Sequence, residues 1–167
     1  MRLLLILTLL NGWHTQQLDF VQAFTQAPVE RDIYMQIPKG FEADLPDPEE
    51  YCLQLHKNLF GQKQAGRVWN KYLVKKLASI GFKQSSVDEC VFYRGTVLYI
   101  LYTNDSILAG PVKSDINAAV QVMKDAGLTV TDEGMLDNFL GVNIDRQNNG
   151  TIKLSQPKLI DQILSDL

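Results

Sequence analysis

Residues 97–110, VLYILYTNDSILAG, place two apolar runs on either side of the polar residues 102–105, YTND. Apolar runs joined by Asn and Asp are typical of a β-hairpin, because both residues tolerate the left-handed backbone of a tight turn. The simplest interpretation is a polar turn. The alternative is a metal site at the hairpin tip, in which Asp105 supplies a carboxylate and Asn104 replaces another.

A second acidic residue makes the metal site more attractive. Residues 16–24, QQLDFVQAF, place Asp19 in or at the end of a strand among apolar neighbours. A carboxylate in such surroundings needs a cation or a hydrogen-bond partner. If the sheet brings Asp19 next to Asp105, their oxygens suit Mg²⁺, and polymerases use two Mg²⁺ ions held by shared carboxylates for phosphoryl transfer.

Periodicity outward from the hairpin predicts the remaining elements. We expect a buried N-terminal helix ended by Asn11-Gly12, strands in residues 32–38 and 51–57, a helix over residues 62–80 stopped by Gly81, strands joined at Gly95, a helix capped by Ser114 and ended by Gly127, a hairpin turned at residues 148–150, and a helix after Gln156. The inward positions are predicted at Val68, Trp69, Tyr72, Leu73, Leu77 and Ile80 in the first long helix and at Ile116, Ala119, Val120 and Met123 in the second. Residues 38–50, which include three prolines, are predicted to form a solvent-exposed loop, an excursion between two strands. This order favours an α+β fold, an antiparallel sheet with helices on one face.

Composition fits one ordinary domain of 167 residues, with 46% apolar and 21% charged residues. The net charge of −3 argues mildly against a free-standing nucleic-acid binder, although it leaves room for a local basic face. Cys52 and Cys90 have no metal-type spacing and are expected to be reduced thiols, in the core or half-buried. His14 and His56 are expected to be partly buried structural residues.

Four basic residues recur at every fourth position of the predicted long helix. They are Lys63, Arg67, Lys71 and Lys75. The stripe is either a solvated helix face or a surface that contacts template phosphates.

Six segments in this order resemble the reverse transcriptase domain of copia-type LTR retrotransposons. They are QLDFVQAF, APVERDIYMQIPKGFE, YCLQLHKNLFGQKQAGRVW, LASIGFKQSSVDECVFYRG, LYTNDSILAG and FLGVNIDR followed by GTIKLSQPKLIDQIL. The resemblance covers most of the chain. It implies a polymerase palm, one reverse transcriptase domain over residues 1–167 with part of the fingers.

The resemblance also implies roles for individual residues. Asp19, the Phe20 carbonyl and Asp105 match metal ligands for two Mg²⁺ ions, and Asp19, Asn104 and Asp105 occupy the catalytic positions. Ala23, Phe24, Gln64 and Ala65 match nucleotide-binding positions, with Phe24 as the aromatic residue that would clash with a ribose 2′-OH. Nucleic-acid contacts fall on Lys63, Arg67, Lys71 and Tyr102, and residues 139–144, FLGVNI, match the hairpin that steadies the primer end.

Two positions depart from the family pattern. Gly66 replaces a proline of the usual GLKQAPRAW, which loosens the segment but removes no chemical group. Asn104 replaces the first aspartate of Tyr-x-Asp-Asp, so a metal ligand loses its negative charge. We therefore expect impaired polymerisation.

The implied partners are an RNA template, a DNA primer, dNTP and the remaining polyprotein domains, including most of the fingers, the thumb and RNase H. The family places them in cytoplasmic virus-like particles, and residues 1–13 make neither a credible signal peptide nor a membrane span. Because Met1 falls inside the family pattern, we expect the reading frame to be longer. Two alternatives stay open: an inactive relic of the same family, or a ferredoxin-like RNA-binding module, although the aromatic signature of such modules is absent.

Overall fold

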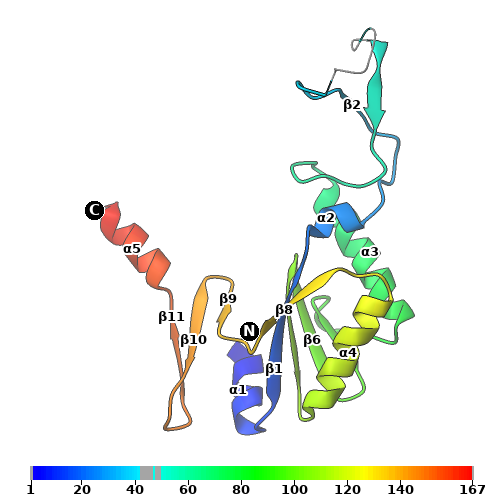
Figure 1. Cartoon of the computed structure of the whole chain (residues 1–167). Helices are drawn as coiled ribbons and strands as arrows, with labels where there is room; N and C mark the ends of the chain where they lie inside the picture. The colour runs from blue at the N-terminus through cyan, green and yellow to red at the C-terminus, as the bar shows by residue number, and fades with distance from the viewer. Residues whose placement is uncertain (1, 42–46, 48–49, 167) are drawn as a thin grey trace. The chain divides into compact units, whose positions relative to one another are not determined.

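The computed structural model describes residues 2–41, 47 and 50–166 of the protein, and the chain divides into two compact units. The first unit comprises residues 1–21 and 76–167, and the second comprises residues 22–75. Figure 1 traces the chain from its N-terminus in blue to its C-terminus in red.

An antiparallel sheet forms the centre of the first unit, with strand order β4-β5-β6-β7-β1-β8 in the described residues. Its strands are β1 (His14–Phe20), β4 (Lys83–Gln84), β5 (Val91–Arg94), β6 (Val97–Tyr102), β7 (Asp105–Gly110) and β8 (Val130–Gly134). Strand β1 therefore lies between β7 and β8, and the strand that carries Asp19 is an inner one. The antiparallel α+β class predicted from the sequence is confirmed.

The hairpin of β6 and β7 is the one predicted from residues 97–110. Buried residues alternate along β6, at Val97, Tyr99 and Leu101, whereas residues 106–110 of β7 are buried throughout. Tyr102 pairs with Asp105, and Thr103 at the tip has a left-handed backbone with φ of 59°. The tight turn thus holds Asn104 and Asp105 at the sheet end.

Helices pack on both faces of this sheet, which refines the expectation of a single helical face. Helix α1 (Arg2–Leu10) places Leu4 and Leu5 in a cluster with Ile107 and Ala109. Helix α4 (Lys113–Asp125) packs against β6 and β7 without joining that cluster. Because successive residues of a strand point to opposite faces, α4 covers the face opposite to α1.

The two long helices follow the predicted pattern at most positions, but the first begins at Ala65 rather than at residue 62, and Tyr72 and Ile80 are only half-buried. Helix α3 (Ala65–Ser79) ends before Gly81, whose φ is 87°, and it buries Val68, Trp69, Leu73 and Leu77. The four inward positions predicted for α4 are also buried. Ser114 is not its cap, because the helix begins at Lys113 and Val112 occupies the N-cap without a side-chain hydrogen bond.

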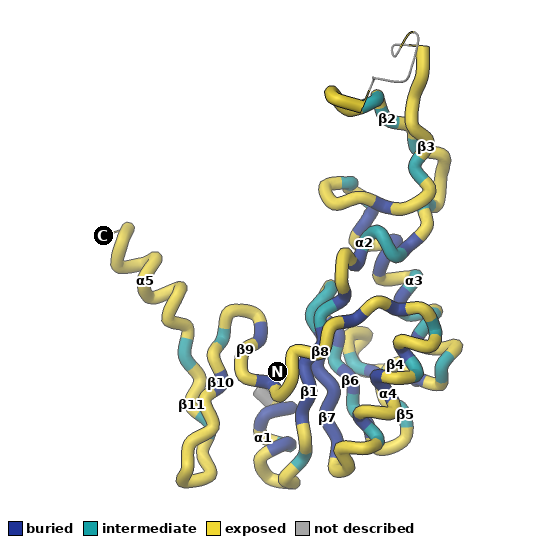
Figure 2. The backbone as a smooth tube through the Cα atoms, viewed as in Figure 1, coloured by how far each residue is buried: buried dark blue, intermediate teal, exposed yellow. Residues whose placement is uncertain are grey.

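A smaller sheet completes the first unit, with β10 (Val142–Arg146) between β9 (Asn138–Phe139) and β11 (Ile152–Ser155). The predicted turn at residues 148–150 joins β10 to β11. Helix α5 (Pro157–Ser165) follows and has no buried residue, as Figure 2 shows.

The second unit consists of α2 (Ala23–Gln26), a two-stranded ribbon of β2 (Tyr34–Gln36) and β3 (Cys52–Gln54), and α3 as far as Lys75. The ribbon confirms the two strands predicted in this region. The fully buried side chain of Asn58 donates hydrogen bonds to the Ala27 and Pro28 carbonyls at 3.1 and 2.9 Å. The predicted excursion over residues 38–50 lies partly outside the described residues.

Two expectations about polar side chains were wrong. Cys52 and Cys90 are free, as predicted, but both are exposed: Cys52 lies on the thin ribbon and Cys90 lies in the turn before β5. His14 and His56 are also exposed, because His14 begins β1 and His56 lies in the bend after β3. No helix in the described part of the chain is long and apolar enough to cross a membrane.

Candidate active site

The two predicted carboxylates lie directly opposite each other in the central sheet. Asp19 of β1 pairs with Asp105 of β7 in the antiparallel register. Opposed residues on neighbouring antiparallel strands have side chains on the same face, at a separation of about 5 Å. Leu18 and Phe20 are buried on either side of Asp19, and the Ser106 hydroxyl donates to the Leu18 carbonyl at 3.2 Å. The carboxylates are therefore positioned by buried strands rather than by a loop.

Asn104 connects the hairpin tip to β1. Its side-chain Nδ2 donates a hydrogen bond to Oδ1 of Asp19 at 3.1 Å, and its backbone carbonyl accepts one from the Phe20 N–H at 3.3 Å. The side chain that replaces the expected carboxylate thus points toward Asp19. It satisfies one oxygen of Asp19, which an aspartate at this position would repel.

Burial and a neighbouring charge both perturb Asp105. Desolvation raises the pKa of Asp105 above its ordinary value, and the negative charge of Asp19 raises it further. Both causes disfavour a pair of ionised carboxylates. A bound cation would remove this penalty, so the electrostatics of the pair suit a positively charged ligand.

The donor set fits a divalent metal ion, although it is poor in charge. No group of three or more His, Cys, Asp or Glu residues that could hold a metal occurs among the described residues. The available oxygens come from Asp19, Asp105, the amide of Asn104 and the backbone at Phe20. Oxygen donors are those that Mg²⁺ prefers, but only two of them carry charge.

Two buried glutamines that the sequence reasoning missed help to fix β1. Gln16 donates to Asp132 at 2.5 Å and accepts from Lys113 at 2.9 Å, while Gln17 donates to Glu133 at 2.9 Å. Both side chains are buried, and their acidic partners lie on β8. Polar residues in a strand with an otherwise buried centre are the signal that could have revealed this network.

The predicted nucleotide-binding residues all lie in the second unit, and the metal-binding candidates all lie in the first. Ala23 and Ala65 are buried, while Phe24 and Gln64 are half-buried. Phe24 stacks on Phe60, with ring centroids 6.0 Å apart and an interplanar angle of 23°. Phe60 is 90% exposed and was not singled out from the sequence.

The predicted nucleic-acid contacts are all exposed: Tyr102 lies in the first unit, and Lys63, Arg67 and Lys71 lie in the second. Arg67 and Lys71 also form ion pairs with Glu30, at 2.6 and 3.6 Å. Glu30 lies 37 residues before Arg67, and no local pattern in the sequence reveals this contact.

Comparison with known proteins supports the same interpretation. The family model described as reverse transcriptase (RNA-dependent DNA polymerase) matches residues 1–167. The chain belongs to the reverse transcriptase family. This reverse transcriptase domain is of the copia type, as its resemblance predicted, and its relatives include transposon polyproteins. Members of the family use divalent metal ions.

Three relatives illustrate the similarity of this reverse transcriptase domain. A transposon Ty5-1 protein of Saccharomyces cerevisiae is 30% identical over 154 residues, which cover 89% of this chain and 49% of that protein. The Pol polyprotein from transposon RE1 of Arabidopsis thaliana is 33% identical over 93% of this chain, and that from transposon TNT 1-94 of Nicotiana tabacum is 29% identical over 89%. The domain spans about half of the first relative and 11% of each polyprotein.

Proposed function

We propose that the chain contributes to RNA-directed DNA synthesis by two-metal nucleotidyl transfer. In this reaction the 3′-OH of a DNA primer attacks the α-phosphate of a dNTP paired with an RNA template, and pyrophosphate leaves. The observation that supports the proposal best is the pairing of Asp19 with Asp105 at the end of the central sheet. The remaining parts of a Pol polyprotein would be its partners.

The first unit would serve as the palm. Asp19, Asp105 and the Phe20 carbonyl would hold Mg²⁺, which when bound supplies charge neutralisation and orients the reacting oxygens. The chain itself would contribute rigid placement of these oxygens, since Leu18 and Phe20 beside Asp19 and Ser106 beside Asp105 are buried. No side-chain base is required, because positioning and electrostatics dominate this type of transfer.

The second unit would serve as part of the fingers and bind substrates. Ala23, Phe24, Gln64 and Ala65 would contact the incoming nucleotide, with Phe24 rejecting a ribose 2′-OH. Lys63, Arg67 and Lys71, together with Tyr102 of the first unit, would contact the template and primer.

Asn104 would limit this activity. A charge pair at about 4 Å and an effective dielectric of about 20 is worth about 4 kcal/mol. Even half of that loss corresponds to a factor of roughly 30 in metal affinity or rate.

A second candidate function is a fold that retains the family structure without its chemistry. The hydrogen bond from Asn104 to Asp19 favours it, because this contact occupies an oxygen that a metal ion would need. The two candidates predict different results for Asn104→Asp. If the chain keeps the family chemistry, the substitution raises Mg²⁺ affinity and primer extension, whereas an inactive fold gains neither.

The deciding experiment measures metal binding and primer extension for the protein, Asn104→Asp and Asp19→Asn. We expect Asn104→Asp to bind Mg²⁺ roughly 30-fold more tightly in calorimetry and to raise extension of a DNA primer on an RNA template by a similar factor. Asp19→Asn should abolish both signals in either background. Equal metal affinity and equal extension with Asn and Asp at position 104 would contradict the proposal, whereas weak extension with Mn²⁺ alone would count against an inactive fold.

A further inference from the structure

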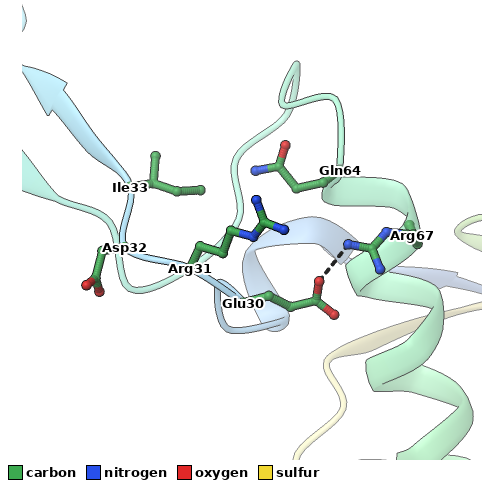
Figure 3. A pocket seen from close by; sticks show the side chains of 6 residues that line it. All are labelled: Glu30, Arg31, Asp32, Ile33, Gln64 and Arg67. Atoms are coloured by element: carbon green, nitrogen blue, oxygen red, sulfur yellow. Dashed lines mark hydrogen bonds and ion pairs between the residues drawn. The ribbon is translucent and has the colours of Figure 1, made fainter.

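A cleft of about 300 Å³ lies within the second unit, between the segment after α2 and the beginning of α3. It is lined by Glu30, Arg31, Asp32, Ile33, Gln64 and Arg67. Figure 3 shows the Arg31 guanidinium directed into the cleft toward the Gln64 side chain, while the Glu30 carboxylate turns to Arg67. Two arginines thus face a space large enough for a small charged group.

Both carboxylates of the cleft have partners, whereas one of its two guanidiniums has none in the described part of the chain. Glu30 is paired with Arg67 and Lys71, and Asp32 accepts a hydrogen bond from Gln54 at 3.2 Å. Arg31 makes no hydrogen bond or ion pair with any residue that the structure describes. Both carboxylates in the cleft are therefore satisfied, whereas one guanidinium is available to an anion.

The contact between Glu30 and Arg67 is suited to exchange. The side chains are 39% and 58% exposed, and solvent-exposed ion pairs contribute little net stability. The carboxylate of Glu30 contacts Arg67 through Oε2 and Lys71 through Oε1, whereas a phosphate can offer the guanidinium two oxygens at once. Partial desolvation raises the pKa of Glu30, but Arg67 and then Lys71 outweigh it and bring the pKa below its ordinary value, so Glu30 is an anion at neutral pH.

We propose that this cleft binds a phosphodiester group of a single-stranded nucleic acid, that Arg31 contacts the phosphate, and that Glu30 is an intramolecular competitor that yields Arg67 to it. The inference deepens the proposed function, since the strand would be the template. Apart from Ile33, the lining is polar or charged and includes no aromatic side chain, so the cleft suits a backbone phosphate rather than a base.

Binding of a 12-nucleotide oligo(U) to the whole chain, measured by fluorescence anisotropy between 50 and 200 mM salt, tests the proposal. We expect Glu30→Gln to bind several-fold more tightly, with a salt slope steeper by about 0.7, the value for one more phosphate contact on a single strand. Arg31→Gln should bind several-fold more weakly, with a slope shallower by a similar amount. Glu30→Asp keeps the charge but shortens the reach to Arg67, so it should also tighten binding.

Asp32→Asn is the matched control, because it removes the same charge from the same cleft. Equal tightening by Asp32→Asn and Glu30→Gln would overturn the competitor role, since net charge alone would then explain both. Inorganic triphosphate that displaces the oligonucleotide at equal molar affinity would overturn the assignment to a strand. All measurements use EDTA and are repeated with Asp19→Asn, so that failure of the metal chemistry cannot be mistaken for failure of this site.

Discussion

Asn104 differs from aspartate by a single group, yet that group reverses its interaction with Asp19. An amide nitrogen donates to the carboxylate at 3.1 Å, where a second carboxylate would repel it. One oxygen of Asp19 therefore has a partner without a metal ion. An aspartate at the same position would leave three acidic groups together, and binding of a cation or of a proton would be needed to relieve their repulsion.

The raised pKa of Asp105 predicts a pH-dependent stability. An acid that binds its proton more tightly in the folded than in the unfolded state stabilises the fold at low pH, and this contribution is lost as pH rises through the folded-state pKa. In urea denaturation with EDTA between pH 4 and 8, we expect the unfolding free energy of the protein to fall relative to that of Asp105→Asn as pH rises from about 4. The exposed Asp161→Asn serves as control, and parallel curves for the protein and Asp105→Asn would contradict the prediction.

Phe24 should determine which sugar is accepted. Replacing it with valine removes the ring that would clash with a ribose 2′-OH, so we expect use of ribonucleotides to rise by on the order of tenfold relative to dNTP. Single-nucleotide extension in the Asn104→Asp background measures the ratio. Phe41→Val, an exposed phenylalanine of the same unit, should leave it unchanged, and an unaltered ratio in Phe24→Val would remove Phe24 from this role.

At the level of single residues, the sequence could predict contacts between side chains that regular strands or helices bring together. It could not predict contacts made by irregular segments. Asp19 and Asp105 could be expected together because Asp105 begins one strand of the sheet and Asp19 lies next to the end of another. Glu30 could not be placed beside Arg67, because an irregular segment brings the two together. The exposure of His14 and Cys90 also depends on where a strand ends, which periodicity does not determine.

Among the elements, α3 allows the clearest prediction about stability, because it continues from the second unit into the first. Leu73 and Leu77 lie on opposite sides of the unit boundary, and both are fully buried. Substituting either with alanine should lower the unfolding free energy by about 2 to 5 kcal/mol. Chemical denaturation measures the change, and Lys75→Ala on the exposed side should alter it by no more than about 0.5 kcal/mol. A loss below 1 kcal/mol at both leucines would indicate that this face of the helix is not packed.

Elements in which apolar residues recur at a regular spacing were predicted well, whereas short or polar elements were missed. The β6–β7 hairpin and helix α4 have clear periods of 2 and 3.6 residues. Strand β8, VTDEG, is exposed at every position after Val130 and carries no such period. It is held by pairing with β1 and by the buried glutamines, which are long-range contacts.

Across the whole molecule, the division into two units separates the metal-binding candidates from the nucleotide-binding candidates. The sequence favoured one domain because its composition and length are ordinary for one. The division arises from where the chain makes its contacts, and hydrophobic periodicity carries no information about that.

The two thiols give a prediction at this scale. Both are exposed, so both should react with a thiol reagent in the native protein. Partial desolvation, and then the charges of Asp88 and Glu89, raise the pKa of Cys90 and lower its thiolate fraction near pH 8. We expect Glu89→Gln to speed labelling of Cys90, measured by mass spectrometry, while Cys52 labels at an unchanged rate. An equal change at both thiols would contradict the local origin of the effect.

The same two thiols have a practical consequence. The chain contains two cysteines, Cys52 in the second unit and Cys90 in the first, and both are free. A nitroxide label on each would span the units without any substitution in the protein. Pulsed electron paramagnetic resonance would then report the distribution of distances between them, and a change in that distribution when a hybrid duplex is added would show that the duplex alters the separation of the two labels.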